Sequence, residues 1–294
     1  SNDNIAQPDA DPNVTTLYTL TVTDAQNCTA TDQVEVEVNT LPSVSFIYSD
    51  TCLGGPTQFT DQTTISSGTL QDFEWDFGDG AGTSTQQNPS YQYGIAGTYD
   101  VKLIVSSGEG CRDSLTRTIE IKDLPLADAG LDVTICNTDS AQIGSATNIL
   151  YSYQWDNTTN TLNNSTISDP KAGPSVTTTY TVTVTEISTG CTATDQVEVI
   201  VDPLPQVDFN FTSTCFTDQT EFTDQTTIVS GTLQGFEWDF GDGVGTSTQQ
   251  NPSYQYVTAG TYDVKLIVTS GEGCKDSLTK QVEITPLPSV SFIY

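Results

Sequence analysis

The sequence contains a long internal repeat, and this repeat constrains the fold more than any other feature. Residues 73–93 read FEWDFGDGAGTSTQQNPSYQY, and residues 236–256 differ from them only where Val244 replaces Ala81. The two blocks are offset by 163 residues, and three pairs of cysteines share that offset. A repeat of this length exceeds one small domain. The chain is therefore predicted to be a tandem array of modules of about 80 residues each.

The composition favours strands and turns over helices. Thr, Ser, Asn, Asp and Gln dominate the polar positions, while Val, Ile, Tyr and Phe dominate the apolar ones. In residues 73–77 the three aromatic side chains alternate, so they point to one face of a strand. The Gly-Asp-Gly of residues 78–80 then predicts a tight turn. We expect an all-β fold made of antiparallel sandwiches.

Internal similarity also predicts the module boundaries. Residues 1–40 match the second half of residues 124–202, and residues 41–123 match residues 203–286. Residues 287–294 read LPSVSFIY, identical to residues 41–48. We therefore expect three complete modules, a truncated module at 1–40 and the first strand of a further module at 287–294. The junctions are short and contain proline, which predicts stiff connections and an extended rod.

The charge of the chain excludes several partners. There are 38 acidic residues against 8 basic ones and no histidine, which gives a net charge of −30. Nucleic acid and anionic lipid surfaces are excluded as partners because both need Lys and Arg. No segment approaches the roughly 20 apolar residues of a membrane helix, so no membrane insertion is expected. A solvated acidic surface suited to a salty medium is the preferred interpretation.

Six of the seven cysteines bracket the three complete modules. Their spacing does not match the C-x-x-C pattern of zinc and redox sites. We predict three disulfides within modules and an oxidising, extracytoplasmic setting, the alternative being buried free thiols in a cytosolic protein. The predicted pairs are Cys52 with Cys111, Cys136 with Cys191 and Cys215 with Cys274.

Cys28 is left unpaired by this scheme. It corresponds to Cys191, and the counterpart of Cys136 would precede Ser1. We expect the partner of Cys28 to lie upstream in a longer protein. An intermolecular disulfide is the alternative.

Two module types resemble known families. The WDFGDG of residues 75–80 and 238–243, with the G-T-Y-D-V of residues 97–101 and 260–264, resembles the signature of polycystic kidney disease (PKD) domains. The middle module resembles the immunoglobulin-like repeats of very large surface adhesins of Bacteroidota, through Ala129–Asp132, Cys136, Thr177–Thr185 and Cys191–Asp195. These resemblances imply β-sandwiches throughout and a spacer or adhesive role in exported proteins.

The turn after the tryptophan strand holds the candidate metal ligands. Two carboxylates per copy could converge on calcium, and some PKD-like domains bind calcium in this region. The alternative, which we favour, is that they cap the turn by accepting backbone N–H groups, because calcium needs six to eight oxygens. No cofactor is required by these patterns. The candidate ligands are Asp76, Asp79, Asp239 and Asp242.

Other motifs carry weaker signals. Core packing is a better interpretation of the tryptophans than stacking on sugars, and the tyrosines at 91, 93, 254 and 256 either cover the end of the sandwich or form an exposed strip. A chain without histidine lacks the usual general base, so no catalytic residue is assigned. Three Asp-Ser-apolar sites resemble the O-glycosylation motif of Bacteroidota proteins: Ser114, Ser140 and Ser277.

Together these features favour a non-enzymatic segment of a very large secreted or cell-surface protein, acting as a stiff stalk, fibre or adhesin. The expected partners are neighbouring domains of the same chain, with glycans, surface proteins or like copies in a fibre as further candidates. One alternative is an array of carbohydrate-binding or accessory modules of a secreted hydrolase. Another is a subunit of a self-assembling extracellular filament.

Overall fold

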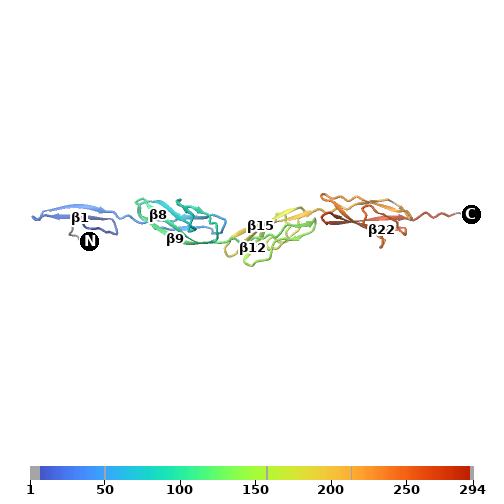
Figure 1. Cartoon of the computed structure of the whole chain (residues 1–294), viewed down its shortest axis with the longest axis horizontal. Coiled ribbons are helices and arrows are strands. Elements are labelled where there is room, and N and C mark those ends of the chain that lie inside the picture. The colour runs from blue at the N-terminus through green and yellow to red at the C-terminus, as the bar shows by residue number, and fades with distance from the viewer. Residues whose placement is uncertain (1–6, 50, 157, 213, 292–294) are drawn as a thin grey trace. The chain divides into compact units, whose positions relative to one another are not determined.

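The computed structural model describes residues 7–49, 51–156, 158–212 and 214–291. The regular secondary structure assigned within these ranges consists of strands, and Figure 1 labels several of them. The prediction of an all-β fold is confirmed. The chain divides after Leu124 into two compact units.

The first unit begins with a two-stranded antiparallel sheet. Strand β1 (Thr16–Thr23) pairs with β2 (Thr29–Val36) along the whole length of both strands. A turn at Asp24–Cys28 joins them, and Asn27 adopts a φ of 64° there. Leu20, Val22 and Val34 are about three-fifths exposed, so one apolar face of this sheet is uncovered in the described chain.

The rest of the first unit is a sandwich of two sheets, β3-β4-β7 and β6-β5-β8-β9. The long hairpin β8–β9 forms one side of the larger sheet, with β9 at its edge, and ends the module. The strands are β3 (Phe46–Tyr48), β4 (Thr57–Asp61), β5 (Leu70–Asp76), β6 (Thr83–Ser84), β7 (Ser90–Tyr91), β8 (Gly97–Ser107) and β9 (Arg112–Ile121).

Alternation along the strands places the core between these two sheets. In β8 the side chains of Val101, Leu103 and Val105 are fully buried, whereas Lys102 between them is exposed. Phe46 from the smaller sheet meets Trp75 from the larger one edge to face, with ring centroids 5.0 Å apart. Burial of such aromatic surface is the main term that stabilises the module.

The second unit starts with a sandwich of a different kind. Its main sheet has the order β10-β15-β14-β12, with β10 parallel to β15, and a small sheet pairs β11 with β13. Trp155 and Tyr180 are 1% exposed and lie at its core. The strands are β10 (Val133–Cys136), β11 (Ala141–Gln142), β12 (Tyr151–Trp155), β13 (Lys171–Ala172), β14 (Thr178–Glu186) and β15 (Thr192–Asp202).

The last sandwich repeats the one in the first unit. Its sheets are β16-β18-β21 and β17-β23-β22-β19-β20, and its core contains Phe209, Trp238 and Leu266. The predicted strand at 287–294 lies partly outside the described residues, and 287–291 form no strand. The strands are β16 (Phe209–Phe211), β17 (Thr214–Cys215), β18 (Thr220–Asp224), β19 (Leu233–Asp239), β20 (Thr246–Ser247), β21 (Ser253–Tyr254), β22 (Gly260–Ser270) and β23 (Lys275–Thr285).

Candidate functional site

The WDFGDG turn follows β5 and is built around two glycines. Gly78 and Gly80 have φ values of +79° and +80°, a region that side chains other than glycine rarely adopt. A Cβ atom at Gly78 would lie 2.6 Å from the backbone oxygen of Asp100 in β8. The turn therefore packs so closely on the neighbouring strand that glycine is required at this position.

The two aspartates of this turn bind its own backbone. The Oδ1 atom of Asp76 accepts the N–H of Gly78 at 2.9 Å. The Oδ1 atom of Asp79 accepts two N–H groups, from Ala81 at 3.0 Å and Gly82 at 2.7 Å. These are the contacts expected of turn-capping side chains.

Asp79 also binds a tyrosine from the following strand. The hydroxyl of Tyr91 donates to Oδ2 of Asp79 at 2.5 Å. This hydrogen bond, with those from the two backbone N–H groups, lowers the pKa of Asp79 below its usual value. The same bond raises the pKa of Tyr91, because the phenol loses its carboxylate partner when it ionises.

The second copy reproduces this arrangement. Asp239 accepts the N–H of Gly241, and Asp242 accepts those of Val244 and Gly245. Burial acts to raise the pKa of Asp242, but hydrogen bonds from Tyr254 and the backbone outweigh it and hold the pKa below its usual value. The hydrogen bond to Asp242 raises the pKa of Tyr254 to about 12.

Calcium at these turns stays a prediction. Among the described residues, no cluster of three or more His, Cys, Asp or Glu side chains is placed to hold a metal ion. The four aspartates make the hydrogen bonds expected if they cap the turn. In each PKD domain, three of the four carboxylate oxygens of the two aspartates accept hydrogen bonds from the protein.

The tryptophans lie in the module cores. Trp75 and Trp238 are 2% exposed, and each donates its indole N–H to a backbone oxygen, of Gln86 and Gln249 respectively. Trp155 is buried in the same way and donates to the oxygen of Ile167. Their ring faces are therefore inaccessible to a sugar.

The tyrosines after the turn extend this aromatic core. Tyr91 stacks on Phe77 with ring centroids 4.2 Å apart and lies edge-on to Tyr93. Tyr93 is 2% exposed and donates its hydroxyl to the backbone oxygen of Phe77 at 2.9 Å. Burial raises its pKa strongly. The second copy has the same stack, so the tyrosines close the end of the sandwich.

An open groove runs along the outer face of the larger sheet. It has a volume of about 700 Å³ and is lined by Glu74, Lys102, Ile104 and neighbouring polar residues. An ion pair of 2.6 Å joins Glu74 to Arg112 beside it. The second copy has an equivalent groove of about 560 Å³. These grooves lie outside the core and offer polar and charged groups to a ligand.

The cysteines occupy two positions that recur in the modules. Four of them lie in the turn directly before the last strand of a module. We call these the turn cysteines: Cys28, Cys111, Cys191 and Cys274. Three lie beside the final residue of the last strand or the residue after it, and we call these the exit cysteines: Cys52, Cys136 and Cys215.

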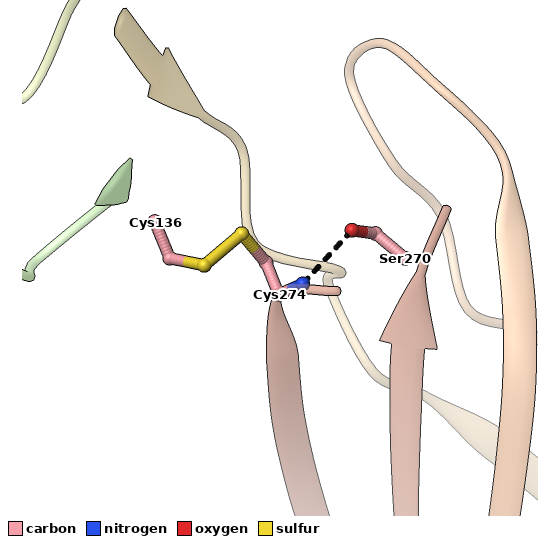
Figure 2. The surroundings of a disulfide bond; sticks show 3 residues. All are labelled: Cys136, Ser270 and Cys274. Atoms are coloured by element: carbon pink, nitrogen blue, oxygen red, sulfur yellow. Dashed lines mark hydrogen bonds between the residues drawn. A yellow bond between two sulfur atoms is a disulfide. The ribbon is translucent and has the colours of Figure 1, made fainter. Parts of the chain in front are cut away.

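The disulfide pattern differs from the prediction. Cys136 of the middle module bonds Cys274 of the following module, as Figure 2 shows. Cys52 and Cys191 are also disulfide-bonded, whereas Cys28, Cys111 and Cys215 are free thiols. The three predicted pairs within modules are therefore wrong.

Strand length explains why the pairs within modules cannot form. Cys52 bridges Lys122, at the far end of β9, whereas Cys111 directly precedes β9. Ten residues of strand span roughly 33 Å, but a disulfide needs Cα atoms within about 7 Å. The same geometry separates the cysteines at the two ends of β15 and of β23.

The serines of the glycosylation motif are exposed. Ser114 and Ser277 lie near the start of β9 and β23, and each donates its N–H to the preceding aspartate. Ser140 lies in the loop before β11 and is exposed too. Glycosylation at these serines stays a prediction.

No helix in the described part of the chain has the length and apolar character needed to cross a membrane.

Comparison with curated proteins gives matches to short segments of collagenases and a metalloprotease. A microbial collagenase of Vibrio alginolyticus is 42% identical over 65 residues, which cover 22% of this chain and 8% of that protein. Collagenase ColA of Bacillus cereus is 36% identical over 66 residues, covering 22% and 7%. These relatives are enzymes, but the matches cover only PKD domains. The chain thus spans less than a tenth of their length.

Solved structures give matches of two kinds. The PKD1 domain of Vibrio anguillarum Epp is 29% identical, with a TM-score of 0.28, and covers 29% of this chain and 99% of that one. The titin I-band fragment I67–I69 is 13% identical, with a TM-score of 0.39, and covers 85% and 100%.

The family model described as "PKD domain" matches residues 39–123 and 202–286, which together make up more than half of the chain. These ranges contain both WDFGDG turns and both complete aromatic cores of the repeated sandwich. The resemblance of residues 41–123 and 203–286 to PKD domains is therefore confirmed, and the chain belongs to the PKD domain family.

Proposed function

We propose that this chain is a non-catalytic spacer segment of a very large exported protein, and that it forms part of a stalk, fibre or adhesin. The observation that carries this proposal is the disulfide between Cys136 and Cys274, which joins two consecutive modules covalently. A bond of this kind limits bending at a junction. Stiffness is useful in a spacer and has no evident use in a set of independent binding modules.

The use of the signature residues supports the same proposal. The tryptophans and tyrosines of both PKD domains fill their own cores, and the turn aspartates bind their own backbone. The residues of the PKD signature thus stabilise the fold of each domain. Acidic residues cover the outside, and their mutual repulsion would keep neighbouring chains apart.

An extracellular location follows from two observations. Disulfides form and persist in oxidising compartments, and four cysteines of this chain are disulfide-bonded. Relatives with similar PKD segments include collagenases, and collagen, the substrate in their name, is found outside cells. We place the segment outside the cell and propose the cell surface as its site.

Small-angle X-ray scattering of the whole chain tests the spacer proposal. A strand of 11 residues spans roughly 36 Å, so three modules in line extend over roughly 110 Å and give a radius of gyration above about 30 Å. A single compact body of this length has a radius of gyration of about 19 Å. The larger value, with a rise in flexibility after reduction, is the expected result. The smaller value would exclude a stalk.

An accessory role in a secreted hydrolase is the second candidate. It is favoured by the collagenase relatives and by the groove that both PKD domains repeat on their outer sheet face. Co-sedimentation of the chain with insoluble collagen tests this role, and Lys102→Glu together with Lys265→Glu should abolish binding through the grooves. Absence of sedimentation with the unmodified chain would eliminate collagen as the ligand.

A further inference from the structure

The free cysteines have the same local structure as their bonded counterparts. Cys111 donates its N–H to Oγ of Ser107 at 3.2 Å, and Cys274 donates to Oγ of Ser270 at the same distance. In both turns the serine N–H donates to the cysteine oxygen at 2.8 Å. Cys274 is bonded and Cys111 is free, although their turns are alike.

The exit cysteines are equally alike. In each module the residue after the exit cysteine donates its N–H to the backbone at the end of the last strand: Leu53 to Lys122, Asn137 to Asp202 and Phe216 to Thr285. This hydrogen bond fixes the cysteine at the end of the module where the chain leaves. Cys52 and Cys136 are bonded there, whereas Cys215 is free and exposed.

The one described bond joins these positions in a defined order. The exit cysteine Cys136 belongs to one module, and the turn cysteine Cys274 belongs to the module that follows it. The turn of Cys274 lies at the end of its module where the chain enters. In this turn the N–H of Gly271 donates to the oxygen of Thr232. The loop that contains Thr232 also contains Thr227, which pairs with Gln206 near the start of the module. An exit cysteine and the next turn cysteine therefore meet at a junction.

We propose that Cys28, Cys111 and Cys215 are half-sites for disulfides with cysteines of adjoining modules of the same two types. Cys111 and Cys28 take an exit cysteine, and Cys215 takes a turn cysteine. Each bond forms by two thiol–disulfide exchanges with a low-molecular-weight disulfide. The two cysteines lose two electrons and two protons, and the oxidant is reduced to two thiols. The inference holds whether the array is a stalk or an accessory region.

A second observation identifies the partner of Cys111. The β1–β2 sheet closely resembles β14–β15 in sequence, but its apolar face is bare. Leu20 is 61% exposed where Val182 is 1% exposed, and Val34 is 61% exposed where Val197 is 1% exposed. In the middle module this face is covered by residues from positions 129–172, which include Trp155.

The cover for β1–β2 should therefore be a half-module with the sequence pattern of residues 124–173. That segment contains the exit cysteine Cys136. One partner would thus satisfy both features: its apolar residues would bury the bare face, and its cysteine would bond Cys111. In the middle module β13 precedes β14 by only a few residues, so the half-module should connect directly ahead of Pro12.

Grafting supplies this partner to the whole chain. Residues 124–173 replace residues 1–11 ahead of Pro12. The chain is oxidised in a glutathione buffer, and disulfides are mapped by mass spectrometry without reduction. The expected result is a bond between the grafted copy of Cys136 and Cys111. Alkylation of Cys111 and amide exchange in β1–β2 should both slow at least tenfold.

Two variants separate the bond from the docking. With Cys136→Ser in the graft, the β1–β2 amides should stay protected while Cys111 becomes alkylatable again. With Trp155→Asp in the graft, both effects should be lost. A bond from the grafted cysteine to Cys28, or a Cys111 that alkylates as fast as in the original chain, would overturn the proposal.

The original chain tests Cys215 without any graft. In the same buffer, Cys215 should bond a free turn cysteine of a second copy, Cys28 or Cys111, which gives disulfide-linked dimers. Such dimers should disappear in a Cys215→Ser variant. Linkage of Cys111 to Cys111, or persistence of dimers without Cys215, would overturn the rule that exit cysteines bond turn cysteines.

Discussion

The two PKD domains have nearly the same sequence around the turn and nearly the same core, yet their cysteines are in opposite states. In the first domain the exit cysteine Cys52 is bonded and the turn cysteine Cys111 is free. In the second the exit cysteine Cys215 is free and the turn cysteine Cys274 is bonded. Local sequence therefore does not determine whether a cysteine is bonded. For Cys274 the bonding partner is supplied by the preceding module.

The comparison separates two levels of stability. The fold of each PKD domain depends on its own aromatic core, which is almost identical in both copies. The covalent link depends on the junction, which differs between them. Substitutions in one copy, with the matched residue of the other as control, distinguish these levels.

The largest effect is expected from the core tryptophans. Trp75→Ala removes a ring in contact with Phe46, Phe59 and Phe77 and should cost about 3–5 kcal/mol of the free energy of unfolding. Because the cores are separate, hydrogen exchange should accelerate only in residues 41–123. Trp238→Ala should act in the same way on residues 203–286. Acceleration in both domains after one substitution would contradict separate cores.

A smaller effect is expected from the cysteines, and it should differ between bonded and free ones. The Cys136–Cys274 bond closes a loop with a sequence separation of 138, and its loss should cost about 2–4 kcal/mol. Cys136→Ser should therefore lower the urea midpoint of the second unit. Cys111→Ser, which removes a free thiol, should change stability by less than about 0.5 kcal/mol.

Two controls belong to this measurement. Cys274 is 1% exposed, so Cys274→Ser also places a hydroxyl in a buried position, and Cys274→Ala corrects for that. Reduction of the unmodified chain also breaks the disulfides of Cys52 and Cys191, so it should lower the midpoint at least as far as Cys136→Ser does. Equal destabilisation by Cys111→Ser and Cys136→Ser would show that the junction bond contributes nothing.

Much of the fold could be predicted because it depends on local patterns. Alternation in residues 73–77 predicted a strand, and these residues lie in β5 apart from Phe77, which follows β5 and is buried. The Gly-Asp-Gly turn predicted positive φ at Gly78 and Gly80, which the structure has. Strand alternation and turn residues depend on residues that are adjacent in the sequence, so strands and turns can be predicted from the sequence alone.

The disulfides could not be predicted in the same way. Pairing within modules was predicted because the cysteines bracket each module, but Cys111 follows Gly108 and Gly110 and so lies at a hairpin end. That position was a usable signal against a pair within the module. The actual pairing depends on which module ends meet, and this information is not contained in either module.

The turn carboxylates should give an effect of about 1 kcal/mol. Asp79→Asn weakens the hydrogen bonds from Tyr91, Gly82 and Ala81, and the exposure of the carboxylate keeps the loss small. The pKa of Asp79 is lowered in the folded state. Its contribution is therefore present above the usual pKa of 3.8 and is lost as the pH falls through the lowered value.

Urea unfolding at pH 7, 4 and 3 measures this dependence. The unmodified first PKD domain should lose stability over that acid range, and the Asp79→Asn variant should lose less. Asp242→Asn provides the matched test in the second copy, where the pKa is lowered as well. A variant with the same acid dependence as the unmodified chain would eliminate Asp79 as a source of it.

The smallest effect is expected where the repeated blocks differ. Val244 is 82% exposed, and its N–H donates to Asp242 at 3.0 Å, the same distance at which the N–H of Ala81 donates to Asp79. The turn thus uses the backbone of this residue, and Val244→Ala should change the free energy of unfolding by less than about 0.5 kcal/mol. A change above about 1 kcal/mol in a thermal melt would mean that the valine side chain is covered in solution. The two domains would then differ at this surface as well as in their cysteines, and the contrast between them could no longer be attributed to the junction alone.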